Sequence, residues 1–372
     1  MKIRWIEFRN NKTELNIERI YFNEDITLLV GLSGAGKTLI LNAIEYSLEL
    51  AVNKMIRLMP YSVCLEFSIK EKIYEWSYNI NYINEKDEII NAEESLGFVN
   101  EQLKENGQIV FKRTENGVFI SGYDKIPQPK KDTSVILQYS DDSKFKFLVS
   151  EMKKIFSIEV ELSIRGGISS ETYRRFKSSI DDKVKSDSEI SYRAFSRLPV
   201  DLKLYAVKKY FHNDVYVKIF EAIKELFMEI QDIDVIEDVE REMYVIAISV
   251  YDKWLMQQDI SNGMLKSIYY IVELMTMSEN AVVLIDEFEN GLGVNCIDLL
   301  SEMIFTERKD LQFIVTSHHP KIINFVDSNK WKIIDRDASI IKNSQSTQYG
   351  IGNSQHDAYF QLINRWEFEG KV

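Results

Sequence analysis

The stretch Gly31–Thr38, GLSGAGKT, decides how this sequence is interpreted. It lies between the apolar run Ile26–Val30 and a run with helical spacing of apolar residues from Thr38 to about Leu50. Its eight residues satisfy G-x-x-x-x-G-K-[ST], and the flanks supply the strand and the helix that this pattern requires. Glycines in such a loop let backbone amides turn toward phosphate oxygens, while the helix directs its positive end at the same anion. The stretch therefore predicts a phosphate-binding loop.

The side chains of this loop predict its ligands, ATP and Mg²⁺. Lys37 is expected to hold the β- and γ-phosphates, and Thr38 to bind the metal through its hydroxyl. The other loop residues expected to contact the nucleotide are Gly31, Ser33, Gly34, Ala35 and Gly36.

A second motif ends an apolar strand, Ala281–Ile285, in two adjacent carboxylates, Asp286 and Glu287. Strand ends of this kind form the ligand-binding edge of a parallel sheet. We expect Asp286 to join the Mg²⁺ shell. Glu287 is expected to act as the general base on the attacking water, because phosphoryl transfer to water needs that water oriented and deprotonated.

Two further segments predict contacts with phosphate. The strand in Phe313–His319 ends in Thr-Ser-His-His, and we expect His318 to donate a hydrogen bond to a γ-phosphate oxygen. Ser261 and Gly263 open a helix in DISNGMLK, which would offer a second helix N-terminus to an anion.

Composition and net charge limit which ligands, cross-links and cellular location we expect. A chain of 372 residues with a net charge of −12 opposes a broadly basic nucleic-acid groove, although a local patch can still bind phosphate. Cys64 and Cys296 show neither disulfide nor metal-ligand spacing. The sequence lacks a signal-peptide pattern and a long apolar run, so we expect a cytoplasmic protein with no membrane partner.

The order of elements predicts an α/β chain with a mainly parallel sheet, an antiparallel β subdomain and a helical subdomain. We expect a nucleotide-binding lobe with an antiparallel meander at 1–145, helices at 146–240, and the second half of the ATPase core at 241–372. Within the helical part, Gly166–Asp187 is interpreted as a mobile or inserted surface segment. The acidic run Asp232–Glu242 is interpreted as a solvated helix face or loop.

Taken in order, GLSGAGKT, DISNGMLK, LIDEFENG and TSHHP resemble the ATP-binding-cassette ATPase heads of the structural-maintenance-of-chromosomes (SMC) and OLD kind. More narrowly, they resemble the small stand-alone AAA-type ATP-binding proteins of bacteria. The resemblance extends from the first strand to about residue 335. It implies a P-loop ATPase fold of the ABC type.

The resemblance also implies a head-to-tail dimer around ATP. Nucleotide held by Lys37 and Thr38 of one subunit would be capped by Ser261 and Gly263 of the other, and hydrolysis would open the pair. The segment Glu289–Gly293 would form the D-loop, and Gln138 is where we expect the glutamine that senses Mg²⁺.

The chain departs from the long-armed members of this group. No sustained heptad pattern occurs between the meander and the signature, so coiled-coil arms are not expected. Only 54 residues follow His318, which leaves no room for the nuclease domain that OLD proteins carry. We therefore expect an ATPase switch, homodimeric or higher, that controls a separate effector such as a nuclease or toxin, as in bacterial anti-phage systems.

Two alternatives remain at this point. A DNA-binding repair or recombination ATPase would use two basic clusters and bind in a salt-dependent way. A transport ATPase would need a membrane subunit, and the SMC-like motif order disfavours it. The clusters in question are Arg174, Arg175 and Lys177, and Lys125, Lys130 and Lys131.

Overall fold

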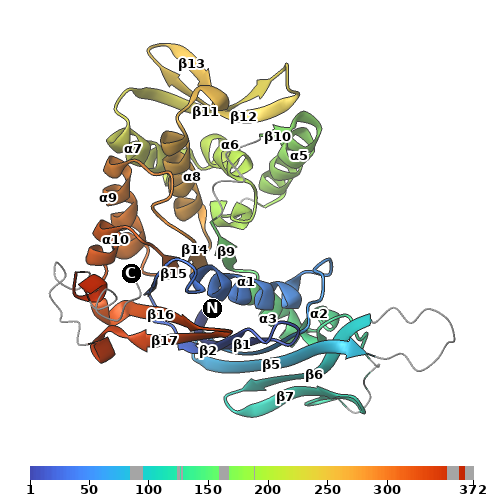
Figure 1. Cartoon of the computed structure of the whole chain (residues 1–372). Helices are drawn as coiled ribbons and strands as arrows, with labels where there is room; N and C mark the ends of the chain where they lie inside the picture. Colours follow the sequence, from blue (N-terminus) through green and yellow to red (C-terminus); the bar gives the residue numbers. More distant parts are fainter. Residues whose placement is uncertain are drawn as a thin grey trace. The chain divides into compact units, whose positions relative to one another are not determined.

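A computed structural model describes residues 1–83, 95–123, 126, 129–158, 167–187, 189–349 and 360–364. The chain divides into two compact units (Figure 1). The sheet unit comprises residues 1–157, 280–288 and 310–372, and the helical unit comprises residues 158–279 and 289–309. The sequence analysis divided the chain by function, at residues 145 and 240, whereas these two units are defined by packing. The division by function therefore stays a prediction. In the described residues, no helix has the length and apolar character needed to cross a membrane.

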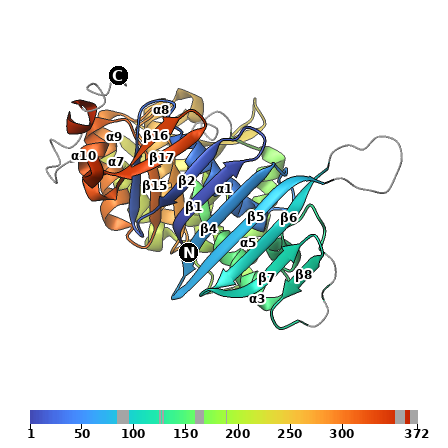
Figure 2. The ribbon, with the colours of Figure 1, turned by 60° about the horizontal axis from the view of Figure 1, so that its bottom comes forward.

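A 13-stranded mixed sheet, ordered β8-β7-β6-β5-β4-β1-β2-β17-β16-β3-β15-β14-β9, forms the sheet unit. Figure 2 shows many of its strands side by side. The strands are β1 (Lys2–Asn10), β2 (Asn16–Tyr21), β3 (Ile26–Val30), β4 (Tyr61–Ile69), β5 (Lys72–Ile83), β6 (Ser95–Glu105), β7 (Gln108–Thr114), β8 (Gly117–Ile120), β9 (Ile155–Ser157), β14 (Val282–Ile285), β15 (Gln312–Thr316), β16 (Trp331–Asp337) and β17 (Ile340–Gln345). Its helices are α1 (Lys37–Val52), α2 (Val135–Gln138), α3 (Ser143–Met152) and α10 (Pro320–Phe325).

Five of these strands, β9, β14, β15, β3 and β16, are parallel neighbours. Val315 pairs with both Ile285 and Leu28, so the three strands end within two residues of a common level. All residues of β3, β14 and β15 are buried, as expected for strands covered on both faces. The predicted α/β fold with a parallel core is confirmed, and the phosphate loop and the two carboxylates follow strands of that core.

The predicted antiparallel meander is also confirmed, as β4 to β8. Burial alternates along β4 and β5, so one face of the meander belongs to the hydrophobic core. That core includes Trp76 and Phe111 of the meander and Ile44 and Leu48 of α1. The meander is thereby anchored to the helix that begins at the phosphate loop.

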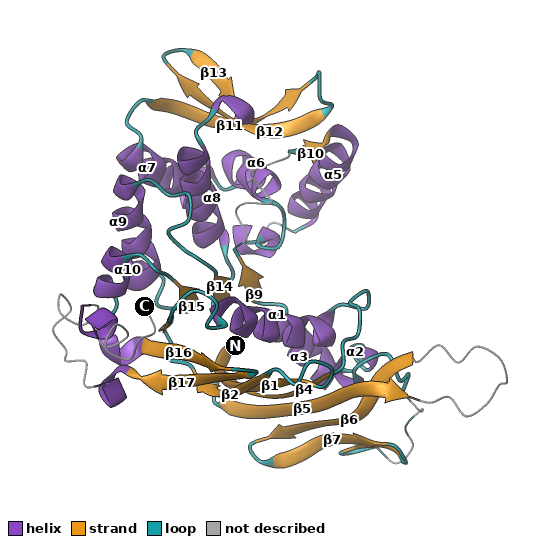
Figure 3. Ribbon diagram, viewed as in Figure 1, coloured by secondary structure: helices purple, strands orange, loops and turns teal. Residues whose placement is uncertain are grey.

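The helical unit contains a smaller sheet and five of the labelled helices (Figure 3). Its elements are β10 (Ile168–Ser169), α5 (Ser170–Ser186), α6 (Val200–Tyr210), α7 (Val217–Leu226), β11 (Ile230–Asp238), β12 (Met243–Val250), β13 (Lys253–Met256), α8 (Asn262–Thr276) and α9 (Val294–Glu302).

Two segments of this unit were interpreted as surface features: the mobility or insertion of the first stays a prediction, and the interpretation of the second was wrong for its strand residues. In the surface segment Gly166–Asp187, the described residues form β10 and α5, and Tyr173 of α5 stacks on Tyr244 with ring centroids 3.9 Å apart. In the acidic run Asp232–Glu242, the residues up to Asp238 belong to strand β11, which pairs with β12, so this part is neither a helix face nor a loop. Residues 239–242 form the turn between the two strands. Lys208 offsets the charge of the strand residues, because Nζ lies 2.9 Å from carboxylate oxygens of both Asp232 and Asp234.

Candidate functional site

The phosphate loop and the carboxylate motif meet directly. The hydroxyl of Thr38, at the start of α1, donates a hydrogen bond of 2.7 Å to Oδ2 of Asp286. Both residues are exposed, so a ligand can reach the pair. The sequence predicted these two oxygens as Mg²⁺ ligands, and the sheet brings them together because β3 and β14 flank the same strand, β15.

Thr316, the last residue of β15, holds the carboxylate motif in place. Its side chain is buried; the hydroxyl donates to Oδ1 of Asp286 at 2.6 Å and accepts from the backbone amide of Glu287 at 2.7 Å. The backbone amide of Phe288, whose side chain is fully buried, donates to the Thr316 carbonyl. Thr316 was not among the predicted site residues. It ends the apolar run FIVT, which the sequence analysis considered only because His318 follows it.

Glu287 has a strained backbone. Its φ is +46°, in the left-handed region that non-glycine residues seldom occupy. Such a conformation costs on the order of 1–3 kcal/mol and persists where the surroundings enforce it, often at functional sites. Here the enforcing contacts are those of Thr316 on one side and buried Phe288 on the other. They fix the backbone of Glu287, whose side chain is exposed, directly after Asp286 in the chain.

Lys37 is folded onto the loop that it belongs to. The side chain is buried, and Nζ donates to the carbonyl oxygens of Gly31 at 2.9 Å and Leu32 at 3.1 Å. Phosphate oxygens could replace these two acceptors after a change of rotamer. The ammonium is therefore kept inside the loop, where the motif requires it.

The three glycines of the phosphate loop have different structural roles. A Cβ at Gly31 would lie 2.4 Å from the carbonyl oxygen of Ile334, and one at Gly36 would lie 2.3 Å from Cδ1 of Ile341. Gly34 has φ +80° and no atom within 4 Å of its Cβ position. Gly31 and Gly36 thus let β16 and β17 approach the loop, whereas Gly34 leaves open space in the middle of the loop.

These residues fit a magnesium–nucleotide complex. Thr38 and Asp286 supply two hard oxygen ligands, and Mg²⁺ commonly takes only one or two protein ligands beside waters and substrate phosphates. Among the described residues, no group of three or more His, Cys, Asp or Glu side chains could hold a metal. The pair therefore suits a metal that arrives with phosphate better than a metal bound by protein alone.

Comparison with known families identifies the chain. The sequence profile of one family matches residues 26–324, from the first residue of β3 to α10. That family is described as "AAA domain, putative AbiEii toxin, Type IV TA system". The chain belongs to this AAA-domain family. Its matched region contains the phosphate loop, the carboxylate motif and Thr316.

A solved structure shows that this AAA-domain protein has the fold of an SMC head. A crystal structure of an SMC head bound to the C-winged helix domain of ScpA matches with a TM-score of 0.54 and 13% identity, covering 92% of this chain and 97% of that one. The SMC head domain from Thermotoga maritima gives a TM-score of 0.45 and 12% identity, with 93% and 99% covered. No curated protein matches the sequence.

The two histidines after β15 have different surroundings in this AAA-domain protein. His319 caps α10, because its Nδ1 accepts the backbone amide of Lys321 at 3.2 Å. His318 is the more exposed of the two and follows Thr316 by two residues. The role of His318 toward the γ-phosphate stays a prediction.

The structure does not bring Gln138 to the Thr38–Asp286 pair. Ser134, which caps α2, donates to the carbonyl of Leu50 near the end of α1, about 18 Å along the helix from Thr38 at ~1.5 Å per residue. The Gln138 side chain accepts the backbone amide of Lys130 instead. On the side of β14 away from β15, the neighbouring strand is β9, whose last residue, Ser157, pairs with Leu284. A short three-residue strand gives little sequence signal, so this topology was missed.

Ser261 and Gly263 open α8 in the helical unit. Ser261 is exposed and caps the helix, since Oγ accepts the backbone amide of Met264. A Cβ at Gly263 would lie 3.2 Å from the carbonyl oxygen of Gly291, and Lys266 Nζ donates to the carbonyl of Asn290. The predicted signature and the predicted D-loop segment therefore pack together, while their contact with nucleotide stays a prediction.

The basic cluster on α5 is partly neutralised. Arg174 forms a 2.6 Å ion pair with Glu237, and Arg175 and Lys177 lie on the same helix as Asp181 and Asp182. In the second cluster, Lys130 and Lys131 are described and Lys125 lies outside the described residues. The ion pair of Arg174 therefore lowers the positive charge that α5 could offer to DNA, and the DNA-binding alternative stays a prediction.

Proposed function

We propose that this protein is a cytoplasmic ATPase that hydrolyses ATP at the Thr38–Asp286 site and uses the cycle as a switch for a separate effector. The observation that carries the proposal is the direct bond between the two predicted metal ligands, with Glu287 as the next residue. Membership of the AAA-domain family and the SMC-head fold support a P-loop ATPase.

The proposed reaction assigns each residue a task. A water molecule attacks the γ-phosphorus, its proton passes to the Glu287 carboxylate, and ADP leaves as the bond to the β-phosphate oxygen breaks. Lys37 and the loop amides stabilise negative charge on the phosphates. Mg²⁺, held by Thr38 and Asp286, would neutralise part of that charge. Thr316 keeps Glu287 in place without touching substrate.

The proposed switch is ATP-dependent self-association, as a homodimer or higher oligomer. Ser261 and Gly263 of one subunit would cap the γ-phosphate bound to another, because the amino end of α8 attracts an anion. The matched SMC head binds a protein partner, ScpA, and the family description mentions a toxin–antitoxin system. These likenesses support an effector protein, such as a nuclease or toxin, in anti-phage defence.

Molar mass is the decisive measurement. Purified Glu287→Gln protein should bind ATP without hydrolysing it, so light scattering should show at least a doubling of mass with ATP and Mg²⁺. Lys37→Ala is the control and should remain at its starting mass. Phosphate release should be measurable for the wild type and lost in both variants. Wild-type protein without phosphate release would contradict hydrolysis, and an unchanged mass for Glu287→Gln would contradict the switch.

A further inference from the structure

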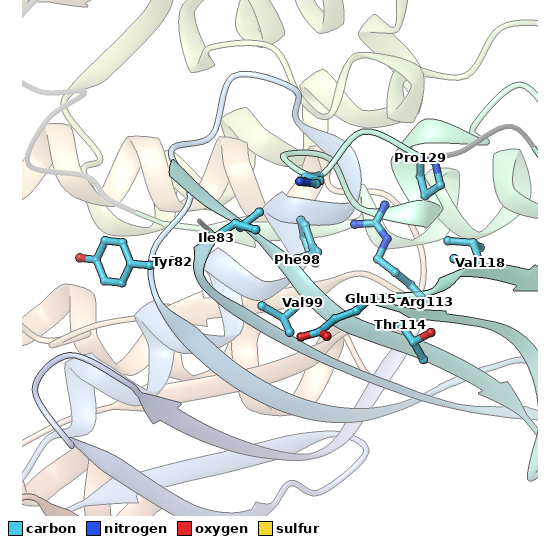
Figure 4. A pocket seen from close by; sticks show the side chains of 11 residues that line it. Tyr82, Ile83, Phe98, Val99, Arg113, Thr114, Glu115, Val118 and Pro129 are labelled. Carbon is cyan, nitrogen blue, oxygen red and sulfur yellow. The ribbon is translucent and has the colours of Figure 1, made fainter. Parts of the chain in front are cut away.

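A cavity of about 420 Å³ at one end of the meander does not select a class of ligand (Figure 4). Its buried cation, Arg113, is 5% exposed and donates to the carbonyl oxygens of Lys130 and Thr133. The charge of Arg113 is therefore met by the protein itself. Figure 4 shows Tyr82 and Val118 at opposite ends of the cavity, so these two side chains do not enclose one binding space. The contacts that lead furthest beyond the nucleotide site lie in the helical unit.

Strand β11 is an edge strand of the smaller sheet. Among the described residues it pairs with β12 alone, and the other side of β12 pairs with β10 and β13. Alternate residues of an edge strand direct their backbone N–H and C=O groups away from the sheet, where a strand of another molecule can pair with them. The side chains of Asp232 and Asp234 are each 44% exposed, so solvent reaches this strand.

The outward backbone groups in the first half of β11 already have partners. The backbone amide of Ile233 donates to Oδ1 of Asp232 at 2.8 Å, and that of Val235 donates to Oδ1 of Asp234 at 2.7 Å. The carbonyl oxygen of Ile233 accepts from Nζ of Lys208 at 2.7 Å. These are two donors and one acceptor that an incoming strand would need for its own hydrogen bonds.

Lys208 connects these contacts. It belongs to α6, which packs against β11 (Figure 3). Its Nζ lies 2.9 and 3.0 Å from the two carboxylate oxygens of Asp232 and 2.9 Å from Oδ2 of Asp234. The hydroxyl of Tyr216 donates to Asp232 at 3.1 Å and lies 3.3 Å from the carbonyl oxygen of Ile233. One ammonium group thus holds both aspartates against the strand to which they belong.

The strand that would suit this edge is β11 of a second copy. Two identical strands in antiparallel arrangement are self-complementary, because each offers the other the same alternation of donors and acceptors. Such pairing would have to displace the Lys208 ammonium from the carbonyl oxygen of Ile233. It would also bring Asp232 and Asp234 of each strand toward those of the other, and like charges oppose pairing. Charged side chains, lysine above all, are a common protection of edge strands.

We propose that Lys208, together with Asp232 and Asp234, closes the edge of β11 against pairing with β11 of a second copy. The closed edge prevents association through this strand when no nucleotide is bound. Self-association is then left to the nucleotide-dependent contact, a consequence that rests on the proposed function. The closure of the edge does not rest on it.

The test measures the molar mass of full-length protein by light scattering, without nucleotide and over a range of concentrations. The triple variant Lys208→Met/Asp232→Thr/Asp234→Thr removes the protecting contacts and places strand-forming polar residues on the edge. It changes the net charge of the chain by only one unit, from −12 to −11. At high concentration its mass should reach at least twice that of the wild type.

Two controls identify the surface through which the triple variant associates. The amide of Val235 points outward, so proline fits there and removes an edge donor without breaking the ladder with β12. Val235→Pro added to the triple variant should restore the wild-type mass. The variant Lys218→Met/Glu221→Gln/Glu225→Gln makes the same charge change at three exposed residues of α7 and should keep the wild-type mass.

Three outcomes would overturn the proposal: a folded triple variant with the wild-type mass, an increase in mass that survives Val235→Pro, or the same increase in the α7 variant. If the triple variant does not fold, Lys208→Met alone provides the test by hydrogen exchange. Its β11 amides should exchange at least about tenfold faster than in the wild type, because the aspartates lose the cation that holds them, while β14 stays unchanged. Unchanged exchange in β11 would also overturn the proposal. These measurements contain no nucleotide, so their outcome is separate from whether the protein hydrolyses ATP.

Discussion

Thr38 and Asp286, 248 positions apart in the sequence, share a hydrogen bond of 2.7 Å. The bond means that the phosphate loop and the carboxylate strand are already in register before a nucleotide binds. A metal ion would have to enter between two oxygens that now hold each other. The position of Asp286 therefore depends on its second hydrogen bond, which its Oδ1 accepts from the hydroxyl of Thr316.

Thr316→Val should lower the ATPase kcat about ten- to a hundredfold, because the isosteric side chain loses both hydrogen bonds that position Asp286 and Glu287. The Kd for ADP should change little, since Lys37 and the loop remain. Thr316→Ser keeps the hydroxyl and should retain most activity. Steady-state kinetics and nucleotide titration check this, and equal kcat for the Val and Ser variants would contradict the positioning role.

Ser261→Asp should separate the capping role of this residue from its proposed role in the dimer. Aspartate caps a helix as well as serine does, so Tm should hold, whereas Ser261→Ala should cost about 1 kcal/mol. The added negative charge would repel a γ-phosphate. In a Glu287→Gln background, Ser261→Asp should therefore abolish the ATP-dependent mass increase, and a persisting increase would remove Ser261 from the dimer contact.

Gly36→Ala should destabilise the protein by about 2–5 kcal/mol, because it combines a positive φ with a collision against Ile341. Gly34→Ala has the positive φ without the collision and should cost about 1–2 kcal/mol. Chemical denaturation measures both. In an Ile341→Ala background the cost of Gly36→Ala should fall toward that of Gly34→Ala; an unchanged cost would show that the contact with β17 is not responsible.

Stability should rise as the pH is lowered from about 7 toward 5. The folded-state pKa of Glu101 is raised to about 7 while its unfolded value is near 4.5, so the folded state binds the extra proton in this window. Asp201, whose pKa burial also raises to about 7, acts in the same direction. Denaturation midpoints against pH should show a shallower slope for Glu101→Gln and for Asp201→Asn. A wild-type slope in both variants would contradict these assignments.

Contiguous motifs made much of this site predictable. Lys37, Thr38, Asp286 and Glu287 each follow a strand whose apolar run is visible in the sequence, and parallel strands end at one edge. Thr316 was missed because its importance lies in two contacts with another strand. Gln138 was misplaced because the sequence does not reveal that α2 packs at the far end of α1.

The acidic strand β11 was misread for a related reason. Asp232 and Asp234 alternate with Ile233 and Val235, a pattern typical of a half-buried strand, but their charges dominated the interpretation. Lys208 of α6 offsets those charges, and its position is set by tertiary packing. The local sequence pattern thus predicted the helices and strands around the site. The charge pairs and the order of the strands in the sheet could be known only from the folded structure.

The close approach of Gly36 to Ile341 has a consequence for biosynthesis. The loop precedes α1, whereas the strand that supports it, β17, follows much later in the chain and is translated after it. A nascent chain that stops before β17 carries the full GLSGAGKT stretch without the surface on which it rests. Competence to bind nucleotide should therefore be acquired only after β17 has been translated, and fragments that end before β17 should not compete for ATP.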